Sequence, residues 1–360
     1  MSSRWIAAVG MLLGLSVAPG HRSSPRLVVW GPGPKPRLVD WGPGPKPEPG
    51  TSRPIDGAPA GKVPVDDLAV RAPRYVAPRD ATTATFVRSA KVYKGRLWLG
   101  TFNDGIFESD ATAAAVVADA TALSRSRRVP APFRMVNDML EVRGALYVAA
   151  NEGLFVTRDG RGFARVPGVN VRGVTALSTS RDTLYATSAS ALWALRLDKT
   201  GPSVSKWWTP AGSRSLQGVV ADERGAWLAS EDRGVLRFDG RKFTAYDRLA
   251  GLPTSWVGAV AGDGRGGVFA ATLRHGALHI EADGKWQRMQ GLPSEWTLSV
   301  ARADGKVCVG TQAGAVCYDD KFPSLYPSER LGGLPDMRVH TMAAIKGGLI
   351  VGTEQEAAIY

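Results

Sequence analysis

Arginine and tryptophan residues occur at matching places along the chain, each just before a segment of apolar and small residues. Six residues share this place or lie close to it: Arg134, Arg172, Arg214, Trp256, Trp296 and Arg338. An indole ring stacks on the face of a sugar, and a guanidinium makes charge-assisted hydrogen bonds with carboxylate or sulfate groups. The pattern therefore predicts recognition of an anionic ligand. The alternative is that the tryptophans only fill space between elements and the arginines only solvate loops.

Histidines and cysteines, which are common in catalytic and metal sites, are sparse. Of the four histidines, His340 lies near the arginine and tryptophan positions, where its ordinary pKa of about 6.5 would let it tune binding. His275 and His279 lie four residues apart, but no cysteine or set of three carboxylates near them completes a metal site. Gly262–Gly267 (GDGRGG) is typical of a turn and not of a phosphate loop, and no G-x-S-x-G motif occurs. We therefore predict no metal, no cofactor and no catalytic residue.

These positions recur because the chain is built from repeats. A short apolar strand that ends in small residues occurs seven times, at intervals of 49, 38, 42, 42, 39 and 42 residues. The copies begin at Leu97, Leu146, Leu184, Ala226, Val268, Val307 and Leu349. A period of about 40 to 50 residues is typical of one propeller blade. The sequence therefore predicts an all-β fold, a seven-bladed β-propeller of four-stranded antiparallel blades.

One unit shows the four strands most clearly, between Gly251 and the return of Gly-Leu-Pro at Gly291. Its apolar patterns predict strands over 257–261, 268–272, 277–280 and 286–289. The second of these is apolar throughout, as in a strand buried on both faces. Asp-Gly pairs between the strands predict tight turns, because both residues tolerate a positive φ. Loops that precede the first strand of each blade surround the central channel, so we expect the arginine and tryptophan positions on one face.

The two ends of the chain are predicted to meet in one blade. Alignment with the earlier blades places Tyr360 on the third strand of the last blade. The same alignment places Arg74-Tyr75-Val76 at an outer-strand position before the first blade begins. We predict that this N-terminal strand completes the last blade, because a ring closed in this way leaves no broad open sheet edge.

The two cysteines can pair with each other. If the segment from Val307 turns at Gln312 and Ala313, Cys308 and Cys317 face each other across two antiparallel strands. Opposed Cβ atoms lie about 4.5 to 5.5 Å apart, so a slight closure brings them to disulfide distance. We expect either a disulfide that staples this hairpin or two buried free thiols, and neither would be a redox centre.

The first 71 residues differ from the rest of the chain. Arg4 precedes an apolar run over 5–17 that is followed by small residues, which predicts a signal peptide over 1–20, with an uncleaved anchor as the alternative. Residues 21–71 are rich in proline and glycine and contain the tandem repeat RLVVWGPGPKP and RLVDWGPGPKP, which favours an extended linker. The propeller is predicted over 72–360, and the protein is predicted to be periplasmic or secreted, in the bacterial envelope.

The chain carries 45 basic and 33 acidic residues, a net charge of +12. This excess favours an anionic partner. The basic residues are dispersed, and the densest run, over 125–128, is typical of a solvated loop, so we predict no nucleic-acid partner. We also expect a monomer with no membrane span once the signal peptide is removed.

Several features recur from blade to blade: LWLGT from Leu97, Gly105-Ile106-Phe107, and the segment AWLASEDRGVLRFDGRKFTAYDRLAGLP over 226–253. This pattern resembles the two-component regulator propeller repeat over about residues 72–360. The resemblance implies a propeller similar to those that form the periplasmic sensing half of hybrid sensor kinases, often for oligosaccharides, in two rings followed by a membrane helix and a kinase. This sequence has one ring and neither of those parts, so we expect a stand-alone binding protein.

The sequence thus predicts an exported, non-enzymatic propeller that binds an anionic carbohydrate or a protein. Two alternatives stay open. One is a lyase or hydrolase similar to the streptogramin-lyase type, with His340 and a bound divalent ion over the channel. The other is a structural module of a cell-surface assembly, which would expose an apolar patch on its outer rim.

Overall fold

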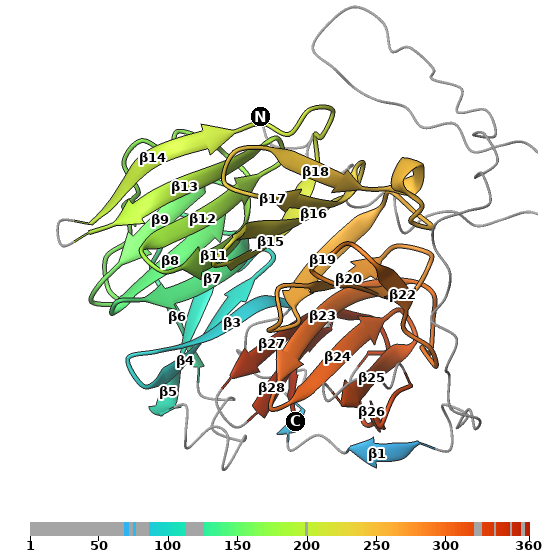
Figure 1. Ribbon diagram of the computed structural model, residues 1–360. Helices are drawn as coiled ribbons and strands as arrows, with labels where there is room; N and C mark the ends of the chain where they lie inside the picture. The colour runs from blue at the N-terminus through green and yellow to red at the C-terminus, as the bar shows by residue number, and fades with distance from the viewer. Residues whose placement is uncertain are drawn as a thin grey trace, which may run out of the picture. The chain divides into compact units, whose positions relative to one another are not determined.

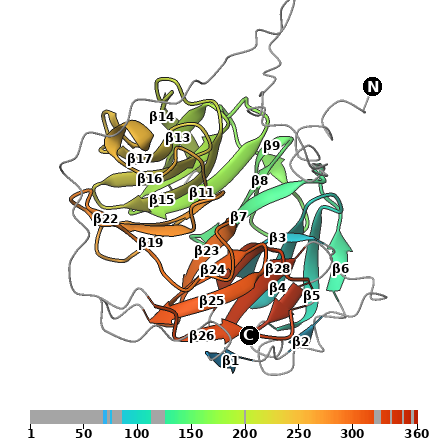
Figure 2. The same cartoon turned by 90° about the vertical axis from the view of Figure 1, so that its right-hand side faces the viewer.

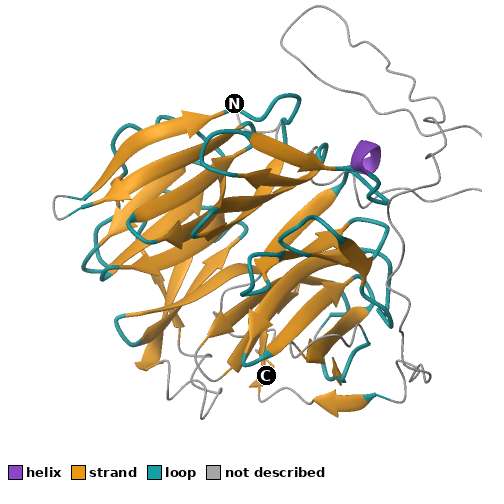
Figure 3. Ribbon diagram, viewed as in Figure 1, coloured by secondary structure: helices purple, strands orange, loops and turns teal. Residues whose placement is uncertain are grey.

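The computed structural model describes residues 68–71, 75–76, 86–112, 126–198, 201–319, 326–334, 336–345, 348–353 and 357–360. These residues form seven sheets arranged in a ring (Figure 1) and one short 3-10 helix, η3 (Arg248–Ala250; Figure 3). The predicted signal peptide and most of the predicted linker lie outside the described residues. In the described ranges no helix has the length and apolar character of a membrane span.

The inner strand of each blade contacts the inner strand of the next, and β27 contacts β3, which closes the ring (Figure 2). The inner strands are β3 (Val87–Tyr93), β7 (Val136–Val142), β11 (Val174–Ser180), β15 (Leu216–Asp222), β19 (Val257–Gly262), β23 (Thr297–Ala303) and β27 (Val339–Ile345). The predicted seven-bladed propeller is confirmed.

The second strand of each blade is the repeated apolar segment of the sequence. These strands are β4 (Arg96–Thr101), β8 (Ala145–Ala150), β12 (Thr183–Ser188), β16 (Gly225–Ser230), β20 (Val268–Thr272), β24 (Lys306–Thr311) and β28 (Gly348–Thr353). Successive side chains of a strand point to opposite faces, so Leu146 lies in the core between the first and second blades and Tyr147 in the core between the second and third. A strand with a core on each face must be apolar throughout, which explains why this segment repeats.

The third strands follow through short connections. They are β5 (Ile106–Thr112), β9 (Gly153–Thr157), β13 (Ala191–Leu197), β17 (Gly234–Phe238), β21 (Ala277–Ile280), β25 (Gly314–Asp319) and β29 (Ala357–Ile359). Six outer strands come next: β6 (Ser126–Val129), β10 (Ala164–Arg165), β14 (Pro202–Trp208), β18 (Phe243–Tyr246), β22 (Trp286–Arg288) and β26 (Glu329–Leu331). The predicted Asp-Gly turns are present. At Asp283, for example, the carboxylate accepts a hydrogen bond of 3.0 Å from the Lys285 N–H, and Gly284 has a φ of 90°.

The last blade is completed from the N-terminal side of the chain. Strand β2 (Tyr75–Val76) pairs antiparallel with β29, with Tyr75 opposite Ile359. The predicted closure is therefore confirmed. The C-terminal residue Tyr360 is buried beside this pairing, and its hydroxyl donates a hydrogen bond of 2.8 Å to the carbonyl of Gly332 in the preceding blade.

A second N-terminal strand was not predicted. Strand β1 (Ala69–Arg71) pairs in parallel with β26 and gives the sixth blade a fifth strand. An ion pair of 3.4 Å between Arg71 and Glu329 and a hydrogen bond from the Gly332 N–H to the Arg71 carbonyl hold it there. The linker predicted over 21–71 therefore ends before residue 69, because its last three residues pair with the propeller.

The register predicted for the two cysteines is also observed. Cys308 on β24 lies directly opposite Cys317 on β25, and a disulfide joins them. Both residues are buried in the core between the sixth and seventh blades. The disulfide therefore links two neighbouring strands inside one blade.

Side chains on the inner strands also join neighbouring blades. Asp138 on β7 accepts hydrogen bonds of 3.2 Å from the Ser89 hydroxyl on β3 and 2.9 Å from the Leu177 N–H on β11. Burial raises the pKa of Asp138, and the positive charge of Lys91 acts in the opposite direction. One carboxylate thus connects three consecutive blades at strand edges that would otherwise carry an unpaired N–H.

Candidate functional site

All seven inner strands begin on one face of the ring, which we call the start face. Loops between the second and third strands lie on the same face, as shown by backbone hydrogen bonds of 3.3 Å from Leu273 to Trp256 and 3.0 Å from Gln312 to Trp296. Each inner strand has a β-bulge after its first residue. The residues at the bulges are Arg88, Asn137, Thr175, Gln217, Gly258, Leu298 and His340.

A bulge leaves one residue outside the regular pairing and re-aims its side chain, so this ring of seven positions belongs to the start face. Of the seven, only His340 was predicted as a site residue. The bulged residue differs in type from blade to blade, whereas the buried residue before it is apolar or threonine in every blade. That contrast was the only feature of the sequence that could have indicated the bulged positions.

The structure brings the predicted site residues to the start face but distributes them over six blades. Arg134, Arg172 and Arg214 each lie two residues before an inner strand and are exposed. The other three precede their strands directly and are half-buried; these are Trp256, Trp296 and Arg338. The arrangement is a rim and not a compact cluster, which suits an extended ligand better than a small molecule.

The junction of the fifth and sixth blades holds both tryptophans. The Arg274 guanidinium lies over the ring of Trp296, 4.6 Å from its centroid, a cation–π contact that orients both groups. The Trp256 indole nitrogen is buried and has no hydrogen-bond partner among the described residues. Arg274 was not predicted, because it lies in the loop between β20 and β21 and not before an inner strand.

Positive charge is concentrated at the same junction. Burial lowers the pKa of His275, and the charges of Arg288, Arg248 and Arg274 lower it further. Arg288 is paired with Glu295. A neutral imidazole among guanidinium groups indicates a positive local potential, which favours an anion.

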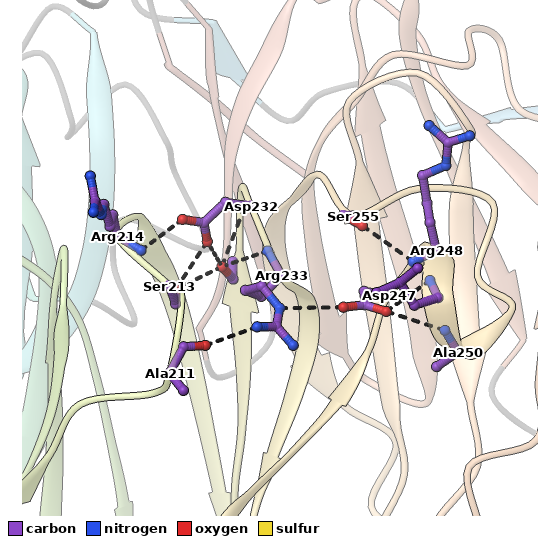
Figure 4. Close-up of polar contacts among 11 residues, drawn as sticks. Ala211, Ser213, Arg214, Asp232, Arg233, Asp247, Arg248, Ala250 and Ser255 are labelled. Carbon is purple, nitrogen blue, oxygen red and sulfur yellow. Dashed lines mark hydrogen bonds and ion pairs between the residues drawn. The ribbon is translucent and has the colours of Figure 1, made fainter. Parts of the chain in front are cut away.

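In the fourth blade, one arginine side chain is bonded to other groups of the protein and another points away from them (Figure 4). Arg233 donates hydrogen bonds of 2.9 Å to the Ala211 carbonyl and 3.3 Å to Asp247, which caps η3. The Arg214 N–H donates to Asp232 at 2.7 Å, while the Arg214 guanidinium points away from this network.

Three guanidinium groups of the start face have no acceptor among the residues that the structure describes. They belong to Arg172, Arg214 and Arg248, all exposed. Figure 4 shows the side chains of Arg214 and Arg248 directed away from the hydrogen-bonded groups. These groups can therefore bind an external anion without breaking an internal contact.

A carboxyl group lies on the start face of the fourth blade, the blade of Arg214. Glu231 is half-buried and accepts a hydrogen bond of 2.6 Å from the Ser215 hydroxyl, which accepts one of 3.0 Å from the Gln217 amide. Burial raises the pKa of Glu231, the bond from Ser215 lowers it, and the charge of Asp232 raises it again. Gln217 is the bulged residue of its strand, so this network reaches the ring of bulged positions.

The seventh blade carries Arg338 and His340. Arg338 forms an ion pair of 3.4 Å with Asp336. Burial alone would raise the pKa of Asp336, but the hydrogen bonds from Arg338 outweigh it, so the pKa is lowered. The His340 ring contacts Phe86 edge-on, with centroids 5.3 Å apart. Arg338 is thus partly neutralised by its own neighbour, unlike Arg172 and Arg214.

The other two histidines of the propeller do not share a site. His275 lies in a loop of the start face, whereas His279 is buried on β21, with its Nε2 3.0 Å from an oxygen of Asp263. That carboxylate also accepts hydrogen bonds from the N–H groups of Arg265 and Gly267 and so holds the turn over 263–267. In the described part of the chain no group of three or more potential metal ligands occurs.

Comparison of the sequence with protein-family models and with curated proteins gives no match. Among solved structures, the chain is similar to the extracellular domains of two proteins described as hybrid two-component systems from B. thetaiotaomicron, with TM-scores of 0.59 and 0.60 and sequence identities of 13% and 14%. The alignments cover 81% and 77% of this chain but 39% and 40% of those chains, so this chain spans less than half of their length.

A virginiamycin B lyase from Staphylococcus aureus is similar as well, with a TM-score of 0.58 and 10% identity over 78% of this chain and 96% of that chain. Extracellular domains of two-component systems and an enzyme thus share one architecture, and architecture alone does not choose between their activities. At these identities the similarity shows the fold: this chain is a seven-bladed β-propeller of the kind found in the extracellular domains of two-component systems.

Proposed function

We propose that this protein is an exported, non-enzymatic propeller that binds an anionic ligand on its start face. The observation that carries the proposal is the set of exposed guanidinium groups with no acceptor among the described residues, Arg172, Arg214 and Arg248, on the same face as the stacked pair of Arg274 and Trp296. Exposed charges without partners contribute little to stability, since even paired surface charges are worth about 0 to 1 kcal/mol. A role in recognition explains them better.

An acidic carbohydrate is the ligand class that uses both kinds of group. Its carboxylates or sulfates would pair with the arginines of the third and fourth blades, and its sugar faces would stack on the tryptophans of the fifth and sixth blades. A protein partner with an acidic surface would use the arginines but would need the tryptophans less. The extracellular two-component domains of similar fold support a sensing role for such binding.

The test is binding of an oligogalacturonate, with a neutral maltooligosaccharide of equal length as its control. We expect oligogalacturonate to bind and its affinity to fall with rising salt, because contacts between exposed charges are screened. Replacement of both Arg172 and Arg214 by Gln should weaken binding about tenfold or more, since a hydrogen bond to a charged group is worth about 1.5 to 3 kcal/mol.

The matched control is Arg241→Gln. Arg241 is also exposed but lies in the turn between β17 and β18, on the opposite face. Equal weakening by the control, or equal binding of the neutral sugar, would contradict recognition at the start face. Cleavage of the probe during incubation would favour the lyase or hydrolase alternative.

A further inference from the structure

Among the seven bulged residues of the start face, only Arg88 on β3 carries a permanent charge. The other six are Asn137, Thr175, Gln217, Gly258, Leu298 and His340. The Arg88 side chain is half-buried, and its guanidinium has no acceptor among the residues that the structure describes. Removal of a charge from water is unfavourable unless an opposite charge compensates for it. The described part of the chain does not supply that compensation.

In the second and fourth blades, the polar bulged residue finds its partners within its own blade. The Asn137 amide donates a hydrogen bond of 3.3 Å to Asn151. The Gln217 amide is joined to Glu231 through the Ser215 hydroxyl, by bonds of 3.0 Å and 2.6 Å. Asn151 and Glu231 occupy the same place, directly after the second strand of the blade. That loop position is thus where a bulged side chain is normally satisfied.

Phe102 occupies this loop position in the first blade. Its N–H donates a hydrogen bond of 3.2 Å to the Phe86 carbonyl, as the Glu231 N–H does to the Ser215 carbonyl at 2.9 Å, so the two loops have matching geometry. Where the fourth blade has a carboxylate, the first blade has an aromatic ring, with its centroid 5.7 Å from the Arg88 guanidinium. A cation–π contact orients a guanidinium but accepts none of its five N–H groups in a hydrogen bond.

Aromatic rings hold this part of the start face in place. Phe86 contacts Phe102 edge-on with centroids 5.0 Å apart, and it contacts His340 of the seventh blade at 5.3 Å. Phe86 has a φ of 52°, which a bulky residue keeps only where its surroundings hold it. The backbone of Arg88 is fixed as well, because its carbonyl accepts a hydrogen bond of 3.2 Å from the Thr341 hydroxyl. A guanidinium held in this way loses little freedom when a ligand binds.

The surroundings of Arg88 differ from those of the other arginines on this face. Burial lowers the pKa of Arg88, and no charge of the described chain acts in the opposite direction. Arg338 and Arg288 are paired with carboxylates of the protein. Arg172 and Arg214 also lack acceptors among the described residues, but they are exposed, so water compensates for their charge. A contact made by the half-buried Arg88 is therefore stronger and less sensitive to salt.

We propose that Arg88 binds one carboxylate of the acidic carbohydrate on the start face and thereby selects a ligand that carries a uronate at this place. This inference rests on the function proposed above and deepens it. The planar carboxylate takes two parallel hydrogen bonds from the guanidinium, with the Phe102 ring against the other side of Arg88. The remaining acidic groups of the ligand pair with the exposed arginines of the third and fourth blades.

Calorimetric titration of the full chain with oligogalacturonate tests the proposal in the wild type and in Arg88→Met. Methionine retains an unbranched apolar side chain against Phe102 but carries no charge. We expect binding to weaken about tenfold or more, since charged hydrogen bonds are lost. Without ligand, the variant should melt at or above the temperature of the wild type, because a half-buried charge without an acceptor has been removed. A lower melting temperature would assign Arg88 to the fold and overturn the proposal.

Salt distinguishes Arg88 from the exposed arginines. Between about 0.05 and 0.3 M salt, the weakening caused by Arg88→Met should persist, whereas that caused by replacement of both Arg172 and Arg214 by Gln should shrink. The matched control is Arg241→Met, on the opposite face, which should leave binding unchanged. Undiminished binding in Arg88→Met, or a loss that shrinks with salt as it does in the double variant, would overturn this assignment alone. Absence of binding in the wild type would overturn the proposed function as well.

Discussion

Reduction of the disulfide between Cys308 and Cys317 should lower the free energy of unfolding by about 2.6 kcal/mol. The two residues are nine apart in the sequence. In the chain-entropy model, a cross-link over nine residues removes about 8.6 cal/mol/K from the unfolded chain, which is about 2.6 kcal/mol at 25 °C. Free cysteines pack as small apolar residues, so the reduced pair adds no large polar penalty to the buried site.

The same figure gives a shift in melting temperature. About 2.1 cal/mol/K of unfolding entropy per residue, over a propeller of about 290 residues, gives about 0.6 kcal/mol/K. A loss of about 2.6 kcal/mol then corresponds to a fall of about 4 °C. This change is well within the resolution of calorimetry, and its sign does not depend on the exact number of ordered residues.

The assay compares oxidised and reduced protein by urea unfolding and by calorimetry. Alkylation with iodoacetamide under denaturing conditions, before and after reduction, counts the free thiols by mass. A double variant with both cysteines changed to alanine supplies the control, because its unfolding curve should not respond to the reductant. Any response in that variant would measure the reductant and not the bond.

Two outcomes would refute this reasoning. If both thiols are alkylated without reduction in protein prepared under oxidising conditions, the hairpin does not carry a disulfide. If reduction breaks the bond but the unfolding midpoint stays the same, loop closure in the unfolded chain is not the source of its stabilisation. In the second case the hairpin would already be formed in the unfolded ensemble, which keeps the two residues close without the bond.

Three further predictions concern the fold. Gly225→Ala should lower the free energy of unfolding by about 3 kcal/mol or more, because Gly225 has a φ of 134° and an added Cβ would collide with the Phe238 carbonyl. Gly240→Ala should lower it by only about 1 to 2 kcal/mol, because Gly240 has a φ of 93° but open space around it. Equal urea midpoints for the two variants would contradict this. Deletion of residues 72–80 should abolish cooperative unfolding, because it removes β2, while a deletion of equal length over 41–49 should not; calorimetry distinguishes them. The free energy of unfolding of the wild type relative to that of Asp138→Asn should fall as pH rises above about 4, because the folded state holds the Asp138 proton more tightly than the unfolded state does. A difference in urea midpoints that stays constant with pH would contradict the raised pKa.

The sequence was sufficient to predict the ring and its closure because both depend on one strongly constrained element. The second strand has a core on each face, so its apolar residues cannot vary much, and its seven copies set the register for every other strand. Strand β1 was missed for the opposite reason. It adds to the edge of β26 by backbone hydrogen bonds over three residues, and a strand held by its backbone leaves little pattern in its side chains.

The candidate site was predictable only in part. Residues just before the inner strands were found because they keep a fixed distance from the repeated segment. Arg274 was missed because it reaches Trp296 from a different loop, a contact that depends on how two blades pack. The bulged residues were missed because a bulge is a property of strand pairing, and the spacing of apolar residues around Gln217 or Asn137 does not reveal which partner each residue faces.

Differences among the repeats point to function more directly than their shared residues do. The second-strand position that faces the next blade is Trp in the first and fourth blades, Tyr147 and Tyr185 in the second and third, and Phe, Cys or Ile in the other three. Replacement of Tyr147 by Trp should be tolerated or even stabilising, because the larger indole would bury more apolar surface in the cavity of about 200 Å³ that Tyr147 lines. A more stable Tyr147→Trp variant would show that stability is not the reason for the tyrosine. A strongly destabilised one would show that the cavity is too shallow for an indole, and that packing alone accounts for the smaller ring.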